Sequence, residues 1–307
     1  MSGLRVAVLG VGLIGGSVGL AARRRLGARV VGYDPDPAAL SRAVELGAID
    51  EASRDIAAAV READYAFLAT PVGSVVEVAQ AALAAAGGDC VVSDVGSTKR
   101  HIAREVSDPR FVPGHPLAGA ETAGVGGAHE DLFDDAVWYL TPACPDAAPA
   151  LPRITALIEQ IGANPVVIDA DAHDRLMASV SHLPHVLANV LVSQALRAAP
   201  AGGGPRGSGA LGANTSFRDA TRVAGANTAI WTDIYMANAD LLAEALDETI
   251  RELSGVRDAL NAEDVDALVA WNERARQERA RLADHPNPNA ASAGGAGREP
   301  PEPARGS

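Results

Sequence analysis

The chain has 307 residues, 48% of them hydrophobic, and its 39 acidic and 26 basic side chains leave a formal net charge of −13 at pH 7. This length suffices for two domains of ordinary size. No stretch is rich in lysine or arginine, which argues against nucleic acid or an anionic membrane as partner, because phosphate neutralisation needs clustered positive charge. We therefore expect a small-molecule substrate, no nucleic acid and no membrane.

The compartment is indicated by what the sequence lacks. The first 20 residues carry neither a basic segment nor a small-residue cleavage site, and no run of 18 uninterrupted apolar residues occurs. The two cysteines, Cys90 and Cys144, are too few for a disulfide scaffold, and Cys90 lies in the apolar run CVVSD, which predicts a buried thiol. These features predict a cytoplasmic protein.

Short runs rich in β-branched residues alternate with Ala-rich segments of helical length from Arg5 to about Asp169. Because crossover helices cover both faces of a parallel sheet, this alternation predicts a doubly wound α/β domain over residues 1–171. The parallel strands are expected at 5–10, 29–34, 65–70, 90–94, 110–115, 137–142 and 165–169.

The pattern of apolar residues changes after this region: they recur at spacings of three and four, and strand-like runs disappear. The pattern predicts an all-α domain over 172–283. Helices this apolar need a partner surface, which favours a homodimer built from this domain. The Gly- and Pro-rich segment 198–213 is expected to form a mobile loop or lid, and the polar segment 284–307 a disordered tail.

The first expected strand leads into the motif GVGLIG and then into a helical segment, which is the context of a dinucleotide site. The first glycine permits a tight turn, the second lets the backbone approach a pyrophosphate, and the third allows the helix to pack closely on the strand. The N-terminus of that helix would face the phosphates. The expected contacts are Gly10, Gly12, Leu13, Ile14 and Gly15.

Asp34 ends the second expected strand, 22 positions after Gly12, where a carboxylate can bind the adenosine ribose hydroxyls. A carboxylate there would repel a 2′-phosphate, which favours NAD over NADP. Asp34 can equally begin a local Asp-Pro turn. Thr70 and Pro71 follow another expected strand and are predicted to shape the cofactor groove.

Two polar side chains follow later strands, at the edge where open α/β sheets bind ligands. His115 precedes a proline, which favours extended backbone and hence a loop. An imidazole there could accept a proton from an alcohol as hydride leaves its carbon, although a histidine in such a place is often structural. Ser97, in the motif DVGSTK, is placed to cap the next helix.

The helical half contains two further candidate clusters. In SHLPH, Ser181, His182 and His185 begin an apolar helix, and no cysteine or carboxylate cluster completes a metal site, so we expect no metal. Arg218 and Arg222 have the i, i+4 spacing of one helix face. Such a pair is either a solvated surface or a fork that binds an anionic substrate.

The ordered motifs GVGLIGGSVG, DVGSTK, GHPLAGAE, SHLPH and FRDATRVA resemble the prephenate/arogenate dehydrogenase family of tyrosine biosynthesis, over residues 5 to about 282. The resemblance implies an N-terminal Rossmann-type doubly wound domain and an all-α dimerisation domain. It also implies an NAD-dependent oxidoreductase that converts prephenate to 4-hydroxyphenylpyruvate by oxidative decarboxylation. The alternative within the family is an arogenate dehydrogenase that forms tyrosine directly.

The resemblance also implies roles for particular residues. His115 would accept the proton of the ring hydroxyl, and Ser97 would assist it beside the nicotinamide. His185 and Arg222 would hold the substrate, with the arginine paired to a carboxylate. Further substrate contacts would be Ser181, His182, Glu121 and Arg218, the last at a position where many relatives carry lysine.

Two other functions remain alternatives. A β-hydroxyacid dehydrogenase would use a lysine of the helical domain as acid and base, but the chain's single lysine, Lys99, lies in the first half. A non-catalytic NAD-sensing dimer would leave His115, His185 and Arg222 without a role. The sequence leaves open the preference between prephenate and arogenate, and inhibition by tyrosine.

Overall fold

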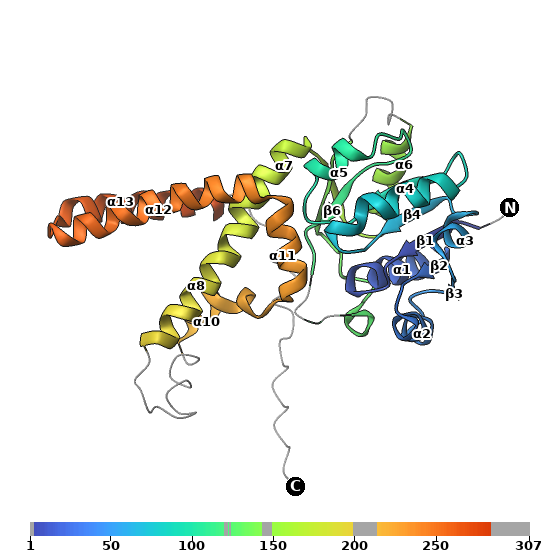
Figure 1. Ribbon diagram of the computed structural model, residues 1–307, viewed down its shortest axis with the longest axis horizontal. Coiled ribbons are helices and arrows are strands. Elements are labelled where there is room, and N and C mark those ends of the chain that lie inside the picture. Colours follow the sequence, from blue (N-terminus) through green and yellow to red (C-terminus); the bar gives the residue numbers. More distant parts are fainter. Residues whose placement is uncertain (1–2, 120–121, 123, 143–148, 199–213, 284–307) are drawn as a thin grey trace, which may run out of the picture.

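The chain folds into an α/β domain followed by a helical domain, which lie side by side (Figure 1). Cys144, the tail 284–307 and most of the expected loop 198–213 lie outside the described residues. The computed structural model describes residues 3–119, 122, 124–142, 149–198 and 214–283.

The main sheet has five parallel strands, in the spatial order β3 (Glu51–Ala52), β2 (Arg29–Tyr33), β1 (Arg5–Leu9), β4 (Tyr65–Leu68) and β5 (Val91–Asp94). The residues of β1 alternate between two hydrophobic clusters, because successive side chains of a strand point to opposite faces. Val6 and Val8 belong to one cluster, and Ala7 and Leu9 belong to the other. Burial on both faces explains why this strand reads as a continuous apolar run.

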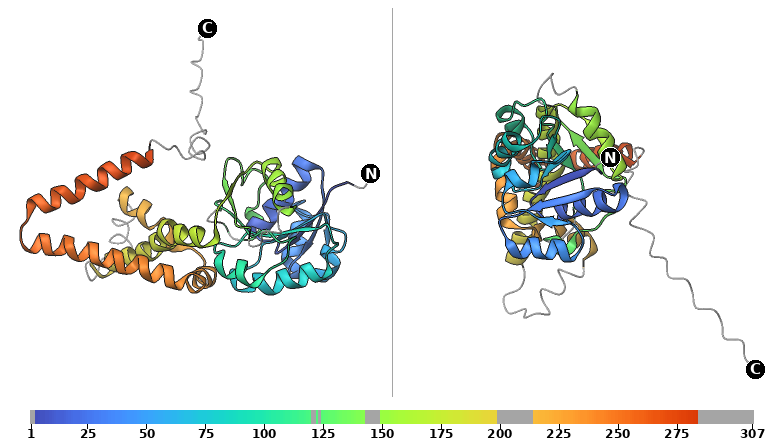
Figure 2. Two further views of the ribbon diagram at one scale, coloured as in Figure 1. Left: turned by 90° about the horizontal axis from the view of Figure 1, so that it is seen from above. Right: turned by 90° about the vertical axis from the view of Figure 1, so that its right-hand side faces the viewer.

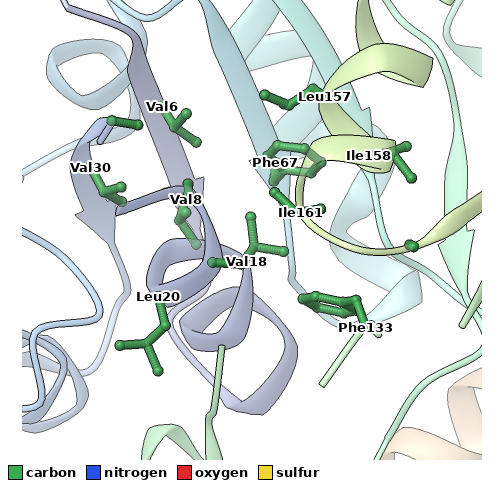
Figure 3. Packing of buried hydrophobic residues seen from close by; sticks show 14 of the residues in the cluster. Val6, Val8, Val18, Leu20, Val30, Phe67, Phe133, Leu157, Ile158 and Ile161 are labelled. Carbon is green, nitrogen blue, oxygen red and sulfur yellow. The ribbon is translucent and has the colours of Figure 1, made fainter. Parts of the chain in front are cut away.

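Helices cover both faces of this sheet, as the alternating sequence predicted. Val18 of α1 (Leu13–Leu26) and Leu157 and Ile158 of α6 (Ala150–Gln160) pack with Val8 in the first cluster (Figure 3). Leu83 of α4 (Val75–Ala85) belongs to the second cluster, on the opposite face. The helices and 3₁₀ turns are α1 (Leu13–Leu26), α2 (Pro37–Glu45), α3 (Ile56–Val60), η1 (Val72–Ser74), α4 (Val75–Ala85), α5 (Arg100–Glu105), η2 (Val125–Gly127) and α6 (Ala150–Gln160).

A second sheet follows, formed by β6 (Gly114–Pro116), β7 (Val137–Leu140) and β8 (Asn164–Val167). β6 pairs antiparallel with β7, so the expectation of parallel strands throughout is wrong here. The chain runs beside β5 at Phe111 and then leaves the main sheet. Pro113 lacks the N–H that would continue the ladder. The strand expected at 110–115 therefore begins at Gly114, and its residues join the second sheet.

The helical domain begins at Ala170, and its last two helices, α12 (Ala239–Asn261) and α13 (Val265–Ala283), project away from the α/β domain as a long hairpin (Figure 2). This hairpin carries exposed large apolar side chains, such as Ile250, Leu253 and Val269. The helices are α7 (Ala170–Met177), the π-helical turn η4 (Ala178–His182), α8 (Leu183–Ala198), α10 (Thr215–Thr221), the 3₁₀ turn η5 (Arg222–Gly225), α11 (Thr228–Ala237), α12 (Ala239–Asn261) and α13 (Val265–Ala283).

Helices α7, η4 and α8 form one continuous rod, Ala170–Ala198, which by length and composition alone could cross a membrane. Only 28% of its most apolar window is buried. The rod nevertheless carries three buried histidines, His173, His182 and His185, each with side-chain partners from other elements. Polar groups buried and partnered in this way are those of a packed interior.

Candidate active site

The glycine motif forms the tight turn between β1 and α1. Gly10 has φ +97°, and a Cβ on it would collide with the carbonyl oxygen of Ala69. A Cβ on Gly15 would collide with the carbonyl oxygen of Gly10, whereas one on Gly12 would meet nothing within 4 Å. The first and third glycines are therefore needed for the turn itself, and the second leaves open space in front of the helix N-terminus. Leu13 and Ile14 form the half-buried first turn of α1.

Asp34 connects this turn to the end of β2. Its Oδ2 accepts the backbone N–H of Val11 at 2.9 Å, and its Oδ1 accepts the N–H of Asp36 at 2.9 Å. The local Asp-Pro turn and the contact with the glycine loop are thus both present. Asp34, Thr70 and Pro71 line a groove of about 420 Å³ together with Gly10.

This groove fits a dinucleotide. It offers the carboxylate of Asp34 to ribose hydroxyls and the hydroxyl of Thr70, whose buried Oγ1 has no hydrogen-bond partner among the described residues. Gly12, two residues after Gly10, leaves open space next to the groove. Buried polar atoms without partners are rare in folded proteins, and a bound ligand is one way to satisfy them. The groove would therefore hold the adenosine and pyrophosphate, with the helix dipole of α1 directed at the phosphates.

The DVGSTK loop is fixed by a buried ion pair between Asp94 and Lys99, both fully buried. Asp94 also accepts the backbone N–H of Gly96 at 2.8 Å and that of Gly114 at 3.1 Å. Burial lowers the pKa of Lys99, and the attraction of Asp94 opposes that effect. Asp94 thus links Lys99 to Gly114 of β6, and removing either member of the ion pair would leave an uncompensated buried charge.

Ser97 does not cap α5, so that prediction is wrong. Lys99 occupies the cap position without a side-chain cap, and its ammonium group is turned to Asp94. The carboxylate of Asp174, from α7, instead accepts the backbone N–H groups of Lys99 at 2.7 Å and Arg100 at 2.9 Å. Ser97 is left half-buried in the loop between β5 and α5.

His115 lies in β6 rather than in a loop, and its side chain meets the helical domain. Its Nδ1 is 2.9 Å from Nε2 of His173, whose Nδ1 is 2.8 Å from Oδ1 of Asp174. Burial lowers the pKa of His115 well below 6.5, and the neighbouring His173 and Lys99 act in the same direction. The imidazole is therefore neutral at pH 7, as a general base must be.

The first histidine of SHLPH, His182, ends the π-helical turn and is buried. The side-chain amide of Asn238 lies 3.2 Å from its Nδ1 and also donates to the carbonyl oxygen of Asp174 at 2.8 Å. Burial lowers the pKa of His182 to about 4. Its Nε2 has no hydrogen-bond partner among the described residues. Because an amide nitrogen donates to Nδ1, the proton of the neutral ring is on Nε2, which is a donor available to a ligand.

The second histidine, His185, is held by aromatic side chains of α11. Its ring stacks on Trp231 at a centroid distance of 3.6 Å and an angle of 11°, and its Nδ1 shares a hydrogen bond with the hydroxyl of Tyr235. Burial lowers the pKa of His185, and the nearby backbone of Val223 opposes this. Ser181 is half-buried on the preceding turn.

The two arginines do not share one regular helix. Arg218 is in α10, whereas Arg222 begins the 3₁₀ turn η5, and both side chains are exposed. η5, which begins with Arg222, packs against α8, the helix that carries His185. Glu121 lies outside the described residues.

Sequence reasoning missed five residues of this region. His173 and Asp174 form an adjacent His-Asp pair in α7, a signal that the sequence did offer. Trp231, Tyr235 and Asn238 lie in or just after α11 and read as ordinary members of an apolar helix, because nothing local indicates that they face histidines about 50 positions earlier.

Known proteins match the chain along nearly its whole length. A family model described as prephenate dehydrogenase, nucleotide-binding domain, matches residues 18–167, and one described as prephenate dehydrogenase, dimerization domain, matches residues 169–273. The chain belongs to the prephenate dehydrogenase family. Its class as a dehydrogenase with a nucleotide-binding Rossmann-type domain, predicted from the motifs, is thereby confirmed.

Individual relatives agree with the family models. The chain is 33% identical to a prephenate dehydrogenase of Bacillus subtilis, over 89% of this chain and 75% of that protein. It is 35% identical to a cyclohexadienyl dehydrogenase of Zymomonas mobilis, over 91% of this chain and 97% of that protein. Among solved structures, prephenate dehydrogenase from A. aeolicus in complex with hydroxyphenyl propionate and NAD+ matches with a TM-score of 0.81 and 27% identity, over 92% of this chain and 99% of that one.

Proposed function

We propose that this protein catalyses the NAD-dependent oxidative decarboxylation of prephenate to 4-hydroxyphenylpyruvate. The observation that carries the proposal is His115, a buried neutral imidazole between the end of the cofactor-binding sheet and the histidines of the helical domain. The proposal is supported by the names of two relatives, both of which cover most of this chain.

The chemistry asks the protein for alignment and one base. NAD, when bound in the groove beside Gly12 and Asp34, supplies the acceptor for a hydride from the ring carbon that bears the hydroxyl. His115 accepts the hydroxyl proton as the hydride leaves. Electrons of the bond to the departing carboxylate then enter the ring, which becomes aromatic as carbon dioxide is released. The aromatic product makes the step effectively irreversible, so geometry is the main requirement.

Substrate binding is assigned to the helical domain. His182 offers a buried Nε2–H donor, and His185 is held rigidly by its stack on Trp231. Arg222 is proposed to pair with a substrate carboxylate, with Arg218, Ser181 and Glu121 as the remaining candidates. A guanidinium suits a carboxylate because it can donate two parallel hydrogen bonds. Ser97 is proposed to assist His115 near the nicotinamide.

A preference for NAD over NADP is proposed from Asp34. Its carboxylate lines the groove where the adenosine ribose would lie. Both groups that donate hydrogen bonds to it are neutral backbone N–H groups. A 2′-phosphate placed there would meet the negative charge of Asp34.

The active form is proposed to be a homodimer assembled through the helical domain. Val190, Leu191 and Leu196 of α8 are exposed, as are Ile250 and Leu253 of α12. A second copy of the chain would cover these faces. We propose a second copy rather than a membrane as the cover, because the rod of α7 to α8 also carries buried, partnered histidines. Light scattering at micromolar concentration should give twice the chain mass, and a monomeric mass would contradict the proposal.

We also propose a cytoplasmic location. It is supported by Cys90, a free and buried cysteine whose thiol has its pKa raised to about 11 by burial. Reduced, inert thiols of this kind suit a reducing compartment.

The decisive experiment is steady-state formation of NADH with four combinations, prephenate or arogenate with NAD or NADP. We expect the highest kcat/KM with prephenate and NAD. Arogenate carries an ammonium group where prephenate carries a keto group, so a higher kcat/KM with arogenate would reassign the substrate while keeping the chemistry. No turnover with either substrate would reject the catalytic proposal and favour a non-catalytic NAD-binding dimer.

A further inference from the structure

His115, His173 and Asp174 form a row of three side chains that no motif of the sequence connected. The rings of His115 and His173 meet edge to face, with centroids 5.1 Å apart and an angle of 73°. His173 is fully buried, and Tyr139 of β7 closes its other side at a centroid distance of 5.4 Å. The row ends at Asp174, which is also fully buried.

The protons of this row have one consistent order, which starts from Asp174. Its carboxylate accepts the backbone N–H groups of Lys99 and Arg100, and the guanidinium of Arg100 lies 3.5 Å from Oδ2. Burial would raise the pKa of Asp174, but the hydrogen bonds from His173, Arg100 and Lys99 outweigh that effect and lower it. An ionised carboxylate is only an acceptor, so the nitrogen that faces it, Nδ1 of His173, carries a proton.

The remaining assignments follow from this first one. A His173 ring that carries one proton, on Nδ1, has an acceptor at Nε2, and Nδ1 of His115 then donates to it across the 2.9 Å contact. Neutral His115 then has no proton on Nε2. The lone pair on Nε2, the nitrogen that points away from His173, is left for a substrate proton.

We propose that His173 and Asp174 are positioning residues that hold His115 in the tautomer with the proton on Nδ1, so that Nε2 is the basic nitrogen. This inference rests on the proposed function, because it assigns the base of that reaction. Without His173, the tautomer with the proton on Nε2 would compete, and that tautomer cannot accept a proton at the nitrogen that faces the substrate. When His115 takes the substrate proton on Nε2, its Nδ1–H remains hydrogen-bonded to His173. The carboxylate of Asp174 stabilises the positive charge that results.

A purely structural role for His173 is the alternative, and two substitutions at this position separate it from the proposal. His173→Phe keeps a ring of similar size but removes the acceptor for Nδ1–H of His115. His173→Gln keeps an acceptor near the position of Nε2, in the side-chain carbonyl. His129→Phe, at an exposed histidine that pairs with Asp131, is the matched control for replacing a histidine by phenylalanine.

Steady-state kinetics with prephenate and NAD should divide these variants. We expect His173→Phe to lower kcat by about 100-fold, with KM values changed by less than about threefold, because a misplaced proton disables general-base catalysis without removing substrate contacts. His173→Gln should recover kcat to within about tenfold of the wild type, and His129→Phe should match the wild type. Equal losses in the Phe and Gln variants, or no loss in His173→Phe, would overturn the proposal.

The tautomer can be observed directly by nitrogen NMR of the histidine rings in the full-length protein at pH 7, assigned with a His115→Asn variant. We expect a protonated Nδ1 and an unprotonated Nε2 for His115 in the wild type and in His173→Gln. A proton on Nε2 in the wild type would refute the inference even if His173→Phe fails to fold. This measurement needs no substrate, so it separates failure of the inference from failure of the proposed function, which the wild-type assay alone decides.

Discussion

The guanidinium of Arg100 donates two hydrogen bonds to the carboxylate of Asp240, one of them from Nη1 to Oδ2 at 2.9 Å. Arg100 begins α5 of the α/β domain and Asp240 lies in α12, so the pair joins the two domains. The same guanidinium reaches Asn238 at 3.3 Å. The hydrogen bond from Arg100 lowers the pKa of Asp240 to about 2. Arg100 also donates its backbone N–H to Asp174, so its ion pair with Asp240 holds the helical domain in place near His115.

Replacing Arg100 by alanine should therefore loosen the joint between the domains. Arg100 is only 14% exposed but Asp240 is 63% exposed, so solvent screens part of the attraction, and we expect a loss of about 1–2 kcal/mol in the free energy of unfolding. Urea unfolding measures this loss. Arg104→Ala is the control on the same helix, because Arg104 and its partner Asp171 are both mostly exposed and should contribute less than about 0.5 kcal/mol. Similar losses in the two variants would contradict a special role for Arg100.

Removing the base should affect turnover far more than cofactor binding. We expect His115→Asn to lower kcat by a factor of about 10² to 10⁴, which is the usual contribution of a general base. The dissociation constant for NAD should stay within about threefold, because His115 does not line the cofactor groove. Steady-state kinetics and calorimetric titration measure the two effects, with His101→Asn at an exposed position of α5 as the control. Unchanged turnover would remove His115 from the role of base.

The cofactor preference should depend on the carboxylate of Asp34. We expect Asp34→Asn to raise KM for NAD by about tenfold, since ribose hydroxyls bind a carboxylate more strongly than an amide, and to raise the relative use of NADP. Asp36→Asn is the matched control, because asparagine can still cap α2 as Asp36 does and Asp36 does not line the groove between β2 and β4. The ratio of kcat/KM values for the two cofactors is the readout, and an unchanged ratio in Asp34→Asn would show that Asp34 serves only the local turn.

The fold and the cofactor site were predictable because their signals are local. The glycine turn, the strand before it and the carboxylate after the next strand lie within the first 34 residues, and each follows from backbone geometry that a short stretch of sequence determines. Alternating apolar runs likewise predicted β1, β2, β4 and β5 to within about two residues at each end.

The environment of the base was not predictable in the same way. His115 and His173 are 58 positions apart and meet only because the helical domain docks on β6. The cap of α5 comes from Asp174, 75 positions after Lys99, so the nearby Ser97 was the wrong choice. Local reading assigns a cap to the nearest hydroxyl, whereas docking of the two domains supplies a stronger acceptor, an ionised carboxylate that serves two N–H groups at once.

The buried histidines should make the protein less stable in mild acid. Burial lowers the pKa of His182 from 6.5 to about 4, so the unfolded chain binds a proton between these pH values and the folded protein does not. The stability that His182 contributes is complete above about pH 6.5 and is lost as the pH falls toward 4, a loss of about 3 kcal/mol at about 1.4 kcal/mol per pKa unit. The depressed pKa of His115 acts in the same direction.

Urea unfolding of the wild type and of His182→Gln between pH 7 and pH 4.5 tests this expectation. Glutamine has no proton to gain, and its amide can still face Asn238, so the variant should lose less stability than the wild type over this range. The difference between the two slopes should approach one proton per chain near pH 5, where His182 titrates in the unfolded state only. Parallel slopes for the two proteins would mean that His182 titrates near its ordinary pKa, with its ring accessible to water.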